Sequence, residues 1–419
     1  MTKIVIIAGG QGTRIASVNS EIPKAMIPVC GKPIIEHEVE LCKRYGFTEF
    51  LFIIGHMGDQ ISSYFGDGQQ WGVHIDYFQE TQPLGTAGAL GYLKDQLTED
   101  FFVLYGDTIV DFDMQAMLAY HRQKQADATL FLHPNDHPYD SDIVDLDADG
   151  QVRQFFNKPH AEGFVSRNIV NAALFVFSPK ILTQIEVGVK SHIEKNVLPR
   201  CLTAGMRLYG YVSFEYIKDM GTPDRYYAVC DDVKRGKVAR LNRSHQRPAI
   251  FLDRDGTISK EVNLLNKPEQ LELIPGAAEA IKLINQSDFL AVVVTNQPVI
   301  ARNLCSIEEL EYIHATLETM LGKQGAYVNA IYYCPHHPDK GYPEERPEYK
   351  IDCDCRKPKP GMLLQAAKDW NIDIARSYMI GDTDRDVQAG QNAGCKQSIK
   401  IETNQADALL EAVRQILNQ

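Results

Sequence analysis

The sequence predicts an α/β protein with two domains, and three observations support this fold class. The chain has 419 residues, whereas single domains usually contain ~100–200. Two short apolar runs, at residues 3–8 and 249–253, each lead into a glycine-containing turn. Further apolar runs alternate with helical patterns after each of them, which is typical of buried parallel strands joined by helices. We therefore expect two separate α/β domains.

The individual elements follow from the same patterns. Short apolar runs predict further strands at residues 49–54, 101–105, 289–294 and 376–380. Helical periodicity predicts helices between them, at residues 34–45, 114–124, 276–286, 360–370 and 383–393.

The domain boundary is predicted at residues 236–248. This stretch contains four cationic residues and no acid, lacks periodicity and ends in Pro248, which suits a linker. The predicted division is residues 1–235, a linker at 236–248, and residues 249–419. An exposed loop inside one domain is the alternative, but a complete βα pattern starts directly after Pro248.

Composition and charge exclude several classes of protein. Hydrophobic residues make up 44% and charged residues 23% of the chain, unlike a disordered or fibrous protein. The net charge of −12 argues against nucleic-acid binding, and the short basic run at 234–247 suits a solvated linker. No window approaches the ~20 apolar residues of a membrane helix, and the N-terminal sequence lacks secretory features. We expect a cytoplasmic protein that binds neither membranes nor nucleic acid. Self-association into a homo-oligomer stays open.

A glycine-rich segment directly follows the first predicted strand. Glycine lets the backbone approach a ligand closely, and its N–H groups can line the phosphates of a nucleoside triphosphate. The candidate binding residues here are Gly9, Gly10, Gly12 and Thr13. Arg14 can add a fixed positive charge for a polyphosphate. The segment matches neither the Walker A sequence nor the dinucleotide-binding pattern, so alone it is a weak signal.

Four later segments make the signal specific. They are residues 23–36, which include Pro23 and Lys24, and residues 80–90, 101–107 and 218–223. In this order they resemble the signature of the sugar-1-phosphate nucleotidyltransferases, over roughly residues 1–235. The resemblance implies a Rossmann-like, glycosyltransferase-A-like fold. It also implies a reaction in which a sugar phosphate oxygen attacks the α-phosphorus of a nucleoside triphosphate and pyrophosphate leaves.

The resemblance assigns roles to individual residues. Asp107 and Asp219 would hold Mg²⁺, which prefers hard oxygen ligands. Arg14 and Lys24 would face the reacting phosphates as catalytic residues, and Lys158 would face the sugar phosphate. The residues implied in nucleotide and sugar binding are Glu80, Gly85, Thr86, Gly106 and Asn171.

Plain structural roles remain alternatives for some of these residues. Strand ends and helix N-termini attract aspartate, so Asp107 and Asp219 could serve there, and Asn171 could simply begin a strand. Asn157 also departs from the family pattern, which has glutamate there. Its neutral amide cannot carry that charge, so the sugar contacts near Lys158 are in doubt.

The second half contains a different set of carboxylates. Asp253 and Asp255 follow the strand predicted at 249–252 and suit phosphoryl transfer. Asp253 would attack phosphorus and form an aspartyl phosphate, while Asp255 would protonate the leaving alcohol and then activate water. Polar segments at 295–297, 356–361 and 381–386 follow in order. Together the four segments resemble the motifs of the haloacid dehalogenase-like phosphatases, over roughly residues 249–403.

This second resemblance implies further roles. Thr295 and Asn296, with Gln297 beside them, would bind the phosphoryl group, and Lys357 would neutralise its charge. Asp382 would bind Mg²⁺ together with the Asp253 carboxylate and the Asp255 backbone carbonyl. The motif-bearing strands all precede their polar residues, as a site at the carboxyl edge of a sheet requires.

A cluster of cysteine and histidine residues predicts a structural zinc site. Four ligands of the kind that zinc prefers are Cys334, His336, Cys353 and Cys355, with His337 as the competing fourth ligand. The other six cysteines show no comparable pattern. The arrangement resembles the zinc-loop phosphatases, which use a Cys-x-His pair, and this favours His336. Zinc would fold the loop and place Arg356 and Lys357 over the substrate.

The two halves together predict consecutive steps of nucleotide-sugar synthesis. The zinc-loop subgroup includes heptose 1,7-bisphosphate phosphatases and histidinol-phosphate phosphatases. Removal of the 7-phosphate from heptose 1,7-bisphosphate leaves heptose 1-phosphate, which a nucleotidyltransferase can activate. The resemblance favours GTP and GDP-D-glycero-α-D-manno-heptose.

The alternative enzyme activities are a histidinol-phosphate or other phosphomonoester phosphatase joined to a transferase for mannose 1-phosphate or another hexose 1-phosphate, with GTP, UTP or dTTP. A different possibility is that one half is a catalytically silent binding or regulatory module, which the intact carboxylates argue against.

Overall fold

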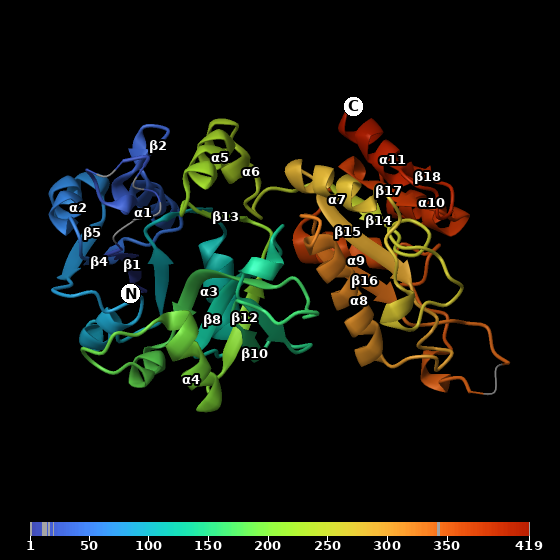
Figure 1. Cartoon of the computed structure of the whole chain (residues 1–419), viewed down its shortest axis with the longest axis horizontal. Helices are drawn as coiled ribbons and strands as arrows, with labels where there is room; N and C mark the ends of the chain where they lie inside the picture. Colours follow the sequence, from blue (N-terminus) through green and yellow to red (C-terminus); the bar gives the residue numbers. More distant parts are fainter. Residues whose placement is uncertain (1, 11–14, 16, 20, 342–343, 419) are drawn as a thin grey trace. The chain divides into compact units, whose positions relative to one another are not determined.

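The computed structural model describes residues 2–10, 15, 17–19, 21–341 and 344–418. The chain forms two compact units that are not continuous in sequence (Figure 1). The first contains Met1–His133, Val144–Asn157 and Asn171–Asn242, and the second contains Pro134–Ile143, Lys158–Val170 and Arg243–Gln419. Two segments of the N-terminal half therefore belong to the second unit, which a linear reading of the sequence did not anticipate.

The first unit is built on a nine-stranded sheet. At its centre β1 (Ile4–Ala8) pairs in parallel with β4 (Glu49–Ile54) and β6 (Phe101–Tyr105), and β4 pairs in parallel with β5 (His74–Gln79). By contrast, β11 (Val170–Phe177) runs antiparallel to β6. The predicted parallel sheet is therefore wrong for part of this unit, because an apolar run indicates a buried strand without giving its direction.

The remaining strands extend this sheet or form short pairs. The sheet runs in the order β10-β9-β11-β6-β1-β4-β5, and β8 joins β11 to β12. The added strands are β8 (Ala128–His133), β9 (Ile143–Leu146), β10 (Val152–Phe156) and β12 (Leu208–Val212). The two short pairs are β2 (Pro28–Val29) with β3 (Lys32–Pro33), and β7 (Thr108–Asp111) with β13 (Tyr216–Asp219).

Helices cover the sheet of the first unit with apolar faces. Ile35, Val39 and Cys42 of α1 are buried in the same core as Ile4 and Phe52, since residues three or four apart share one face of a helix. The helices are α1 (Ile34–Arg44), α2 (Gly58–Phe65), α3 (Met114–Gln123), α4 (Leu198–Thr203), α5 (Pro223–Lys234) and α6 (Lys237–Arg240).

The second unit contains a five-stranded, fully parallel sheet in the order β16-β15-β14-β17-β18. Its strands are β14 (Ala249–Leu252), β15 (Leu290–Asn296), β16 (Ala330–Cys334), β17 (Tyr378–Gly381) and β18 (Gln397–Lys400). Because β14 lies between β15 and β17, the polar residues that follow these three strands meet at one sheet edge.

Helices of the second unit pack on this sheet. Side chains of α7, α8 and α11 are buried in one core with Ile250 and Leu252 of β14. A reciprocal capping box between Ser306 and Glu309 begins α8. The helices are α7 (Ala277–Gln286), α8 (Ile307–Gly322), α9 (Gly361–Trp370), α10 (Asp384–Ala393) and α11 (Ala408–Leu417).

Every strand and helix predicted by residue range is present, and the observed ends lie within two residues of the predicted ones. The stretch 236–248 was expected to lack regular structure, yet its first part forms the short helix α6. Gly236 precedes this helix in the left-handed region, with φ 68°, so it changes the chain direction between α5 and α6.

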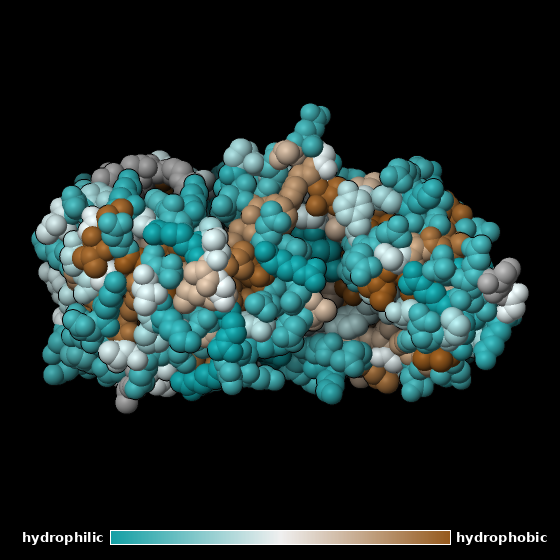
Figure 2. Space-filling model, turned by 90° about the horizontal axis from the view of Figure 1, so that it is seen from below, coloured by the Kyte–Doolittle hydropathy of each residue, from teal (hydrophilic) through white to brown (hydrophobic). Residues whose placement is uncertain are grey.

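The hydropathy of the surface and the length of the helices can be compared with the expectation that the protein does not bind membranes. Hydrophilic residues dominate the face drawn in Figure 2, and hydrophobic residues occupy small areas of it. Among the described residues, no helix has both the length and the apolar character needed to cross a bilayer.

Candidate active sites and metal centre

In the first unit, Lys24 and Asp107 lie together at the carboxyl end of β6. The Lys24 ammonium contacts the Asp107 carboxylate, and the two side chains are 13% and 34% exposed. Lys24 lies in a short 3-10 helix, Lys24–Met26, that begins after Pro23. A cation and a carboxylate that both reach solvent can form new interactions with a phosphate and a metal ion.

The pairing of β7 with β13 brings Asp219 near Asp107. Asp219 lies opposite Thr108 in this ladder, and the Met220 N–H donates to the Asp107 carbonyl at 3.0 Å. Burial alone would raise the pKa of Asp219, but the Arg225 guanidinium at 2.6 Å, the Gly221 N–H and Lys24 together lower it. The two carboxylates predicted to bind Mg²⁺ thus lie on neighbouring chain segments.

The predicted nucleotide-binding residues on β1, β6 and the 80–90 segment also converge. Glu80 accepts a hydrogen bond from the Leu84 N–H at 3.2 Å, and burial raises its pKa. A β-carbon on Gly9 would collide with the Glu80 carboxylate as it lies here, so Gly9 and Glu80 approach each other closely. The Gly106 N–H donates to the Ile7 carbonyl at 3.0 Å, which places it beside β1.

Other predicted residues have mainly structural contacts. The Thr86 hydroxyl accepts a hydrogen bond from the Ile193 N–H at 2.9 Å, and Gly85 has φ 75° beside Ser191. Asn171 accepts from the Ala173 N–H at 3.2 Å. Gly10 is open to added volume, since a β-carbon there would meet nothing within 4 Å.

Some of the residues predicted for the nucleotidyltransferase site are not described residues of the first unit. Gly12, Thr13 and Arg14 lie outside the described residues. Lys158 belongs to the second unit, where its ammonium pairs with Asp140 at 3.4 Å and its N–H donates to Asp142 at 3.0 Å. The structure therefore does not test whether Arg14 and Lys158 join Lys24 at one site.

The sequence reasoning missed a pair beside β6. The Tyr105 hydroxyl donates to the Glu194 carboxylate at 2.5 Å, although 89 residues separate the two in sequence. Tyr105 directly precedes Gly106, so Glu194 helps to fix the end of the strand that carries Asp107. No local pattern marks Glu194, because the contact depends on long-range folding.

In the second unit, a buried lysine joins two carboxylates. Lys357 lies 2.9 Å from Asp253 and 2.6 Å from Asp386, and its side chain is 2% exposed. Burial raises the pKa of Asp253, and the nearby Lys357 charge opposes this shift. Burial would also raise the pKa of Asp386, but Lys357 and hydrogen bonds from Thr383 lower it.

The site residue that the sequence analysis did not assign is Asp386. It occurs at the end of the 381–386 segment but received no role, because the family motif draws attention to Asp382. Asp386 also closes the capping box at the start of α10, which fixes its orientation. The spacing of three residues between Thr383 and Asp386, which is that of a capping box, was the signal available in the sequence.

Three carboxylates meet the requirements of a hard cation. Oxygen atoms of Asp253, Asp382 and Asp386 lie within 4.8 Å of one another. The Asp382 Oδ2 atom accepts a hydrogen bond from Thr403 at 2.8 Å, whereas its buried Oδ1 has no hydrogen-bond partner among the described residues. An unpaired carboxylate oxygen in a carboxylate cluster suits Mg²⁺. Gly256, at φ 79°, lies against Asp382 where a β-carbon would collide.

The polar residues at the carboxyl end of β15 make hydrogen bonds to other predicted site residues. The Asn296 side chain accepts from the Lys357 N–H at 3.0 Å and donates to the Lys357 carbonyl at 3.1 Å. The Gln297 amide donates to Asp255 at 2.9 Å and to Thr295 at 2.8 Å. Arg356 donates to the His336 carbonyl at 3.1 Å. Asn296 thus holds Lys357 and Gln297 holds Asp255, and binding of a phosphoryl group by these residues stays a prediction.

Four sulfur and nitrogen ligands converge next to this site. Ligand atoms of Cys334, His336, Cys353 and Cys355 all lie within 4.8 Å of one another. The three sulfur–sulfur distances are 3.1, 3.2 and 3.4 Å. These exceed the ~2.05 Å of a disulfide and approach the about 3.8 Å edge of a tetrahedron with metal–sulfur bonds of about 2.3 Å. The geometry fits a closed, four-ligand zinc site.

The structure separates the two candidate histidines. His336 Nδ1 lies 3.4 Å from Cys355 Sγ and 3.9 Å from Cys334 Sγ. His337 instead accepts a hydrogen bond from the Asp339 N–H at 3.2 Å and is absent from the cluster. The hydrogen bond between Cys355 and Cys334 lowers the pKa of Cys355, which favours a thiolate. Thiolate is the form that binds zinc.

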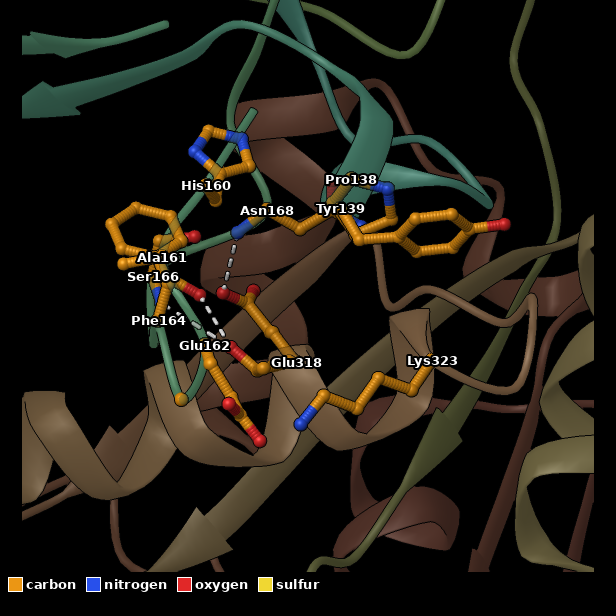
Figure 3. Close-up of a pocket in the computed structure, with 12 residues that line it drawn as sticks. Pro138, Tyr139, His160, Ala161, Glu162, Phe164, Ser166, Asn168, Glu318 and Lys323 are labelled. Carbon is orange, nitrogen blue, oxygen red and sulfur yellow. Dashed lines mark hydrogen bonds between the residues drawn. The ribbon is translucent and has the colours of Figure 1, made fainter. Parts of the chain in front are cut away.

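A separate pocket of about 300 Å³ lies in the second unit (Figure 3). It is lined by residues of 138–168 and by Glu318, Thr319 and Lys323 of α8. Glu318 accepts from the Asn168 N–H at 3.1 Å, and the rings of His160 and Phe164 stack 4.5 Å apart. None of the predicted site residues lines this pocket.

Comparisons with known proteins match both halves of the chain. A model of the nucleotidyl transferase family matches residues 3–236, and a HAD-hydrolase-like model matches residues 354–412. The D-glycero-beta-D-manno-heptose-1,7-bisphosphate 7-phosphatase of Pasteurella multocida is 39% identical over 40% of this chain and 93% of that protein.

The N-terminal half is similar to transferases for two different bases. UTP–glucose-1-phosphate uridylyltransferase of Synechocystis sp. is 30% identical over 59% of this chain and 66% of that protein. Mannose-1-phosphate guanyltransferase beta-B of Xenopus laevis is 32% identical over 59% of this chain and 69% of that protein. The chain thus spans about two thirds of the length of these two transferases.

The chain belongs to the nucleotidyl transferase family. Its C-terminal part belongs to the HAD-like phosphatases. It is therefore an enzyme that combines a nucleotidyltransferase with a phosphatase.

Proposed function

We propose that the chain catalyses two consecutive steps in the synthesis of GDP-D-glycero-α-D-manno-heptose. The phosphatase half removes the 7-phosphate of heptose 1,7-bisphosphate, and the transferase half joins the resulting heptose 1-phosphate to GTP. The observation that carries this proposal is the presence of both sites in one chain, with a phosphatase half similar to heptose bisphosphate 7-phosphatases.

In the phosphatase reaction, Asp253 attacks the 7-phosphorus and forms an aspartyl phosphate. The heptose 7-oxygen leaves with a proton from Asp255, which then takes a proton from the attacking water. Lys357 keeps Asp253 oriented and offsets the charge that gathers on the phosphoryl oxygens. Bound Mg²⁺ would be held by Asp253, Asp382 and the Asp255 carbonyl, and it supplies further charge neutralisation.

In the transferase reaction, an oxygen of heptose 1-phosphate attacks the α-phosphorus of GTP. Both groups are anionic, so the protein must bring them together and neutralise their charge. Lys24 faces the phosphates, and Arg14, which lies outside the described residues, would add positive charge there. The role of Lys158 toward the sugar phosphate rests on the family resemblance alone. Asp107 and Asp219 would hold Mg²⁺, which supplies charge neutralisation at the reacting phosphates.

Three refinements of this function have separate support. Zinc in the Cys334, His336, Cys353 and Cys355 cluster would be structural, because four protein ligands leave no open position. The guanyltransferase relative supports GTP as the nucleotide, whereas the uridylyltransferase relative supports UTP. The name of the phosphatase relative specifies the β-anomer of heptose 1,7-bisphosphate. The α-anomer proposed here is supported only by the proposed GDP-heptose product, which has the α configuration. We place the enzyme in the cytoplasm.

A substrate panel tests the proposal. Phosphate release is measured with both anomers of heptose 1,7-bisphosphate and with histidinol phosphate, and pyrophosphate release with heptose 1-phosphate and mannose 1-phosphate with each of GTP, UTP, dTTP and ATP. We expect the highest kcat/KM for the α-bisphosphate and for heptose 1-phosphate with GTP. Preference for histidinol phosphate or for UTP would overturn the corresponding half of the proposal.

A further inference from the structure

The turn between β2 and β3 contains a cysteine at a position that favours other residues. Cys30 and Gly31 form this two-residue turn and have φ 51° and 89°, both in the left-handed region. Such turns favour asparagine or glycine at the first position, because most side chains strain the backbone there. All nine cysteines lie among the described residues, and Cys30 is the exposed one. Its thiol is therefore open to reagents in solution.

A second cysteine, Cys230 of α5, lies against this turn. The Cys30 thiol donates to the Cys230 carbonyl at 3.6 Å. In the other direction, the Cys30 N–H donates to the Cys230 sulfur. Each sulfur thus lies beside the backbone of the other residue. Rotation of the two side chains about their Cα–Cβ bonds, with a small shift of the backbone, can bring the sulfurs to the ~2.05 Å of a disulfide.

Neighbouring residues hold Cys230 in this place. Its side chain is buried in one core with Val29 of β2. One turn earlier on α5, the Tyr226 hydroxyl donates to the Pro28 carbonyl at 2.8 Å, which fastens the helix to the same strand. Burial raises the pKa of the Cys230 thiol, and hydrogen bonds from Tyr226 and the Cys30 N–H oppose this shift. Cys30 is thus placed to meet an oxidant, and Cys230 is kept beside it as a partner.

We propose that Cys30 and Cys230 are a reversible oxidation site, whose disulfide joins the β2–β3 turn to α5 and lowers nucleotidyl transfer. The oxidant is a hydroperoxide. The Cys30 sulfur attacks its terminal oxygen, the O–O bond breaks, and an alcohol and a sulfenic acid form. The Cys230 sulfur then attacks the Cys30 sulfur, and the sulfenic oxygen leaves as water. Two thiols and one hydroperoxide thus give a disulfide, an alcohol (water in the case of hydrogen peroxide) and a water.

The disulfide would connect the two segments that carry the candidate transferase site. Lys24 lies in the short helix that leads into β2, and Asp219 is the last residue of β13, just before α5. Because the Cys30 sulfur faces a carbonyl in the reduced chain, forming the bond shifts the turn against the helix. A misplacement of about 1 Å can cost roughly 100-fold in rate. We therefore expect the disulfide to slow transfer without affecting phosphate release.

The test treats the full chain with hydrogen peroxide and compares it with Cys30→Ser, Cys230→Ser and Cys395→Ser. Peptide mass spectrometry should find Cys30 linked to Cys230 in wild type and in the Cys395 variant. Pyrophosphate release from heptose 1-phosphate and GTP should fall at least about fivefold in these two proteins. Dithiothreitol should restore it. The Cys30 variant should keep its transfer rate through the same treatment. Phosphate release is followed in parallel, because oxidation of the zinc-site thiols would lower that activity instead.

Three results would overturn the inference. They are the absence of the linked peptide while Cys30 still reacts with an alkylating reagent, an equal loss of transfer in wild type and Cys30→Ser, and a linked peptide with unchanged transfer. Because Cys30 is exposed, its serine variant keeps the test valid even if Cys230→Ser does not fold. The peptide readout needs no substrate. A wild type without transfer activity would therefore overturn the proposed function, whereas absence of the linked peptide would overturn this inference alone.

Discussion

The two candidate active sites each pair a lysine with a carboxylate, but the pairs differ in how exposed they are to solvent. Lys357 and Asp253 are 2% and 13% exposed, and Asp386 at 1% completes their group. Lys24 and Asp107 are 13% and 34% exposed, and Asp219 is 46% exposed. The phosphatase carboxylates Asp253 and Asp386 are thus largely enclosed, whereas the transferase carboxylates Asp107 and Asp219 remain more open to solvent.

This difference follows from the chemistry. In the proposed phosphatase reaction a side chain of the protein is the nucleophile, so its position and charge must be fixed before substrate arrives. In the transferase half both reactants are bound anions, and the protein positions them and neutralises their charge. We therefore expect that removing a carboxylate from one site abolishes the activity of that site and leaves the activity of the other unchanged.

The largest expected effect comes from Asp253→Asn. An amide cannot attack phosphorus in place of the carboxylate, so phosphate release should fall by at least about 10⁴-fold. Pyrophosphate release from heptose 1-phosphate and GTP should stay within twofold of wild type, roughly. Asp384→Asn is the matched control, because Asp384 is an exposed aspartate of the 381–386 segment in the same unit and pairs with Lys400. Loss of both activities in a folded Asp253 variant would contradict two independent sites.

The reciprocal change is Asp107→Ala. It removes a carboxylate proposed to hold Mg²⁺ and the partner of Lys24, so nucleotidyl transfer should fall roughly 10³-fold. Phosphate release from the bisphosphate should be unaffected. Asp149→Ala, which removes an exposed partner of Lys124, should affect neither assay. A variant that retained transfer would remove Asp107 from the site.

A smaller effect, again on one half only, is expected from Cys353→Ser. Loss of one sulfur ligand should weaken zinc binding, loosen the segment that carries Lys357, and lower phosphatase kcat/KM by about 10–100-fold. Metal analysis should find about one zinc per wild-type chain and less in the variant. Cys395→Ser, outside the cluster, is the control. Wild-type protein purified without chelators but lacking zinc would contradict the site.

The smallest effect on activity is expected at Arg167, within the second unit. Its guanidinium lies 2.6 Å from Glu318, which is 4% exposed, and 2.8 Å from Glu311. Arg167→Met leaves a buried carboxylate without its partner and should lower the free energy of unfolding by about 3 kcal/mol. The matched control is Arg414→Met, which removes an arginine from an exposed pair with Glu279. Urea titration of both variants measures the difference in their free energies of unfolding. Equal stability of the two variants would show that the segment 158–170 contributes little to the second unit.

Sequence patterns predicted the elements and the order of the motifs well, because apolar periodicity is local. They also indicated that Asp253, Thr295 and Asp382 follow strands, and the parallel β15-β14-β17 order brings these residues together. The resemblance to the zinc-loop phosphatases favoured His336 over His337 as the fourth ligand, and the fold places His336 in the cluster.

What the sequence did not predict depends on long-range packing. The membership of 134–143 and 158–170 in the second unit, the Tyr105–Glu194 pair and the contact of Lys357 with Asp386 join residues far apart in the chain. The sequence analysis also assigned no role to Arg254. Its burial and its two side-chain hydrogen bonds to Asp255 depend on the folded turn after β14. The antiparallel direction of β11 was missed for the same reason.

The most direct test of the whole account is a single incubation. The full chain is mixed with α-heptose 1,7-bisphosphate, Mg²⁺ and each nucleoside triphosphate in turn, and the products are identified by mass spectrometry. We predict GDP-heptose without a 7-phosphate, formed only with GTP and only after heptose 1-phosphate appears. A nucleotide sugar that keeps the 7-phosphate, or no nucleotide sugar with any of the triphosphates, would contradict the account.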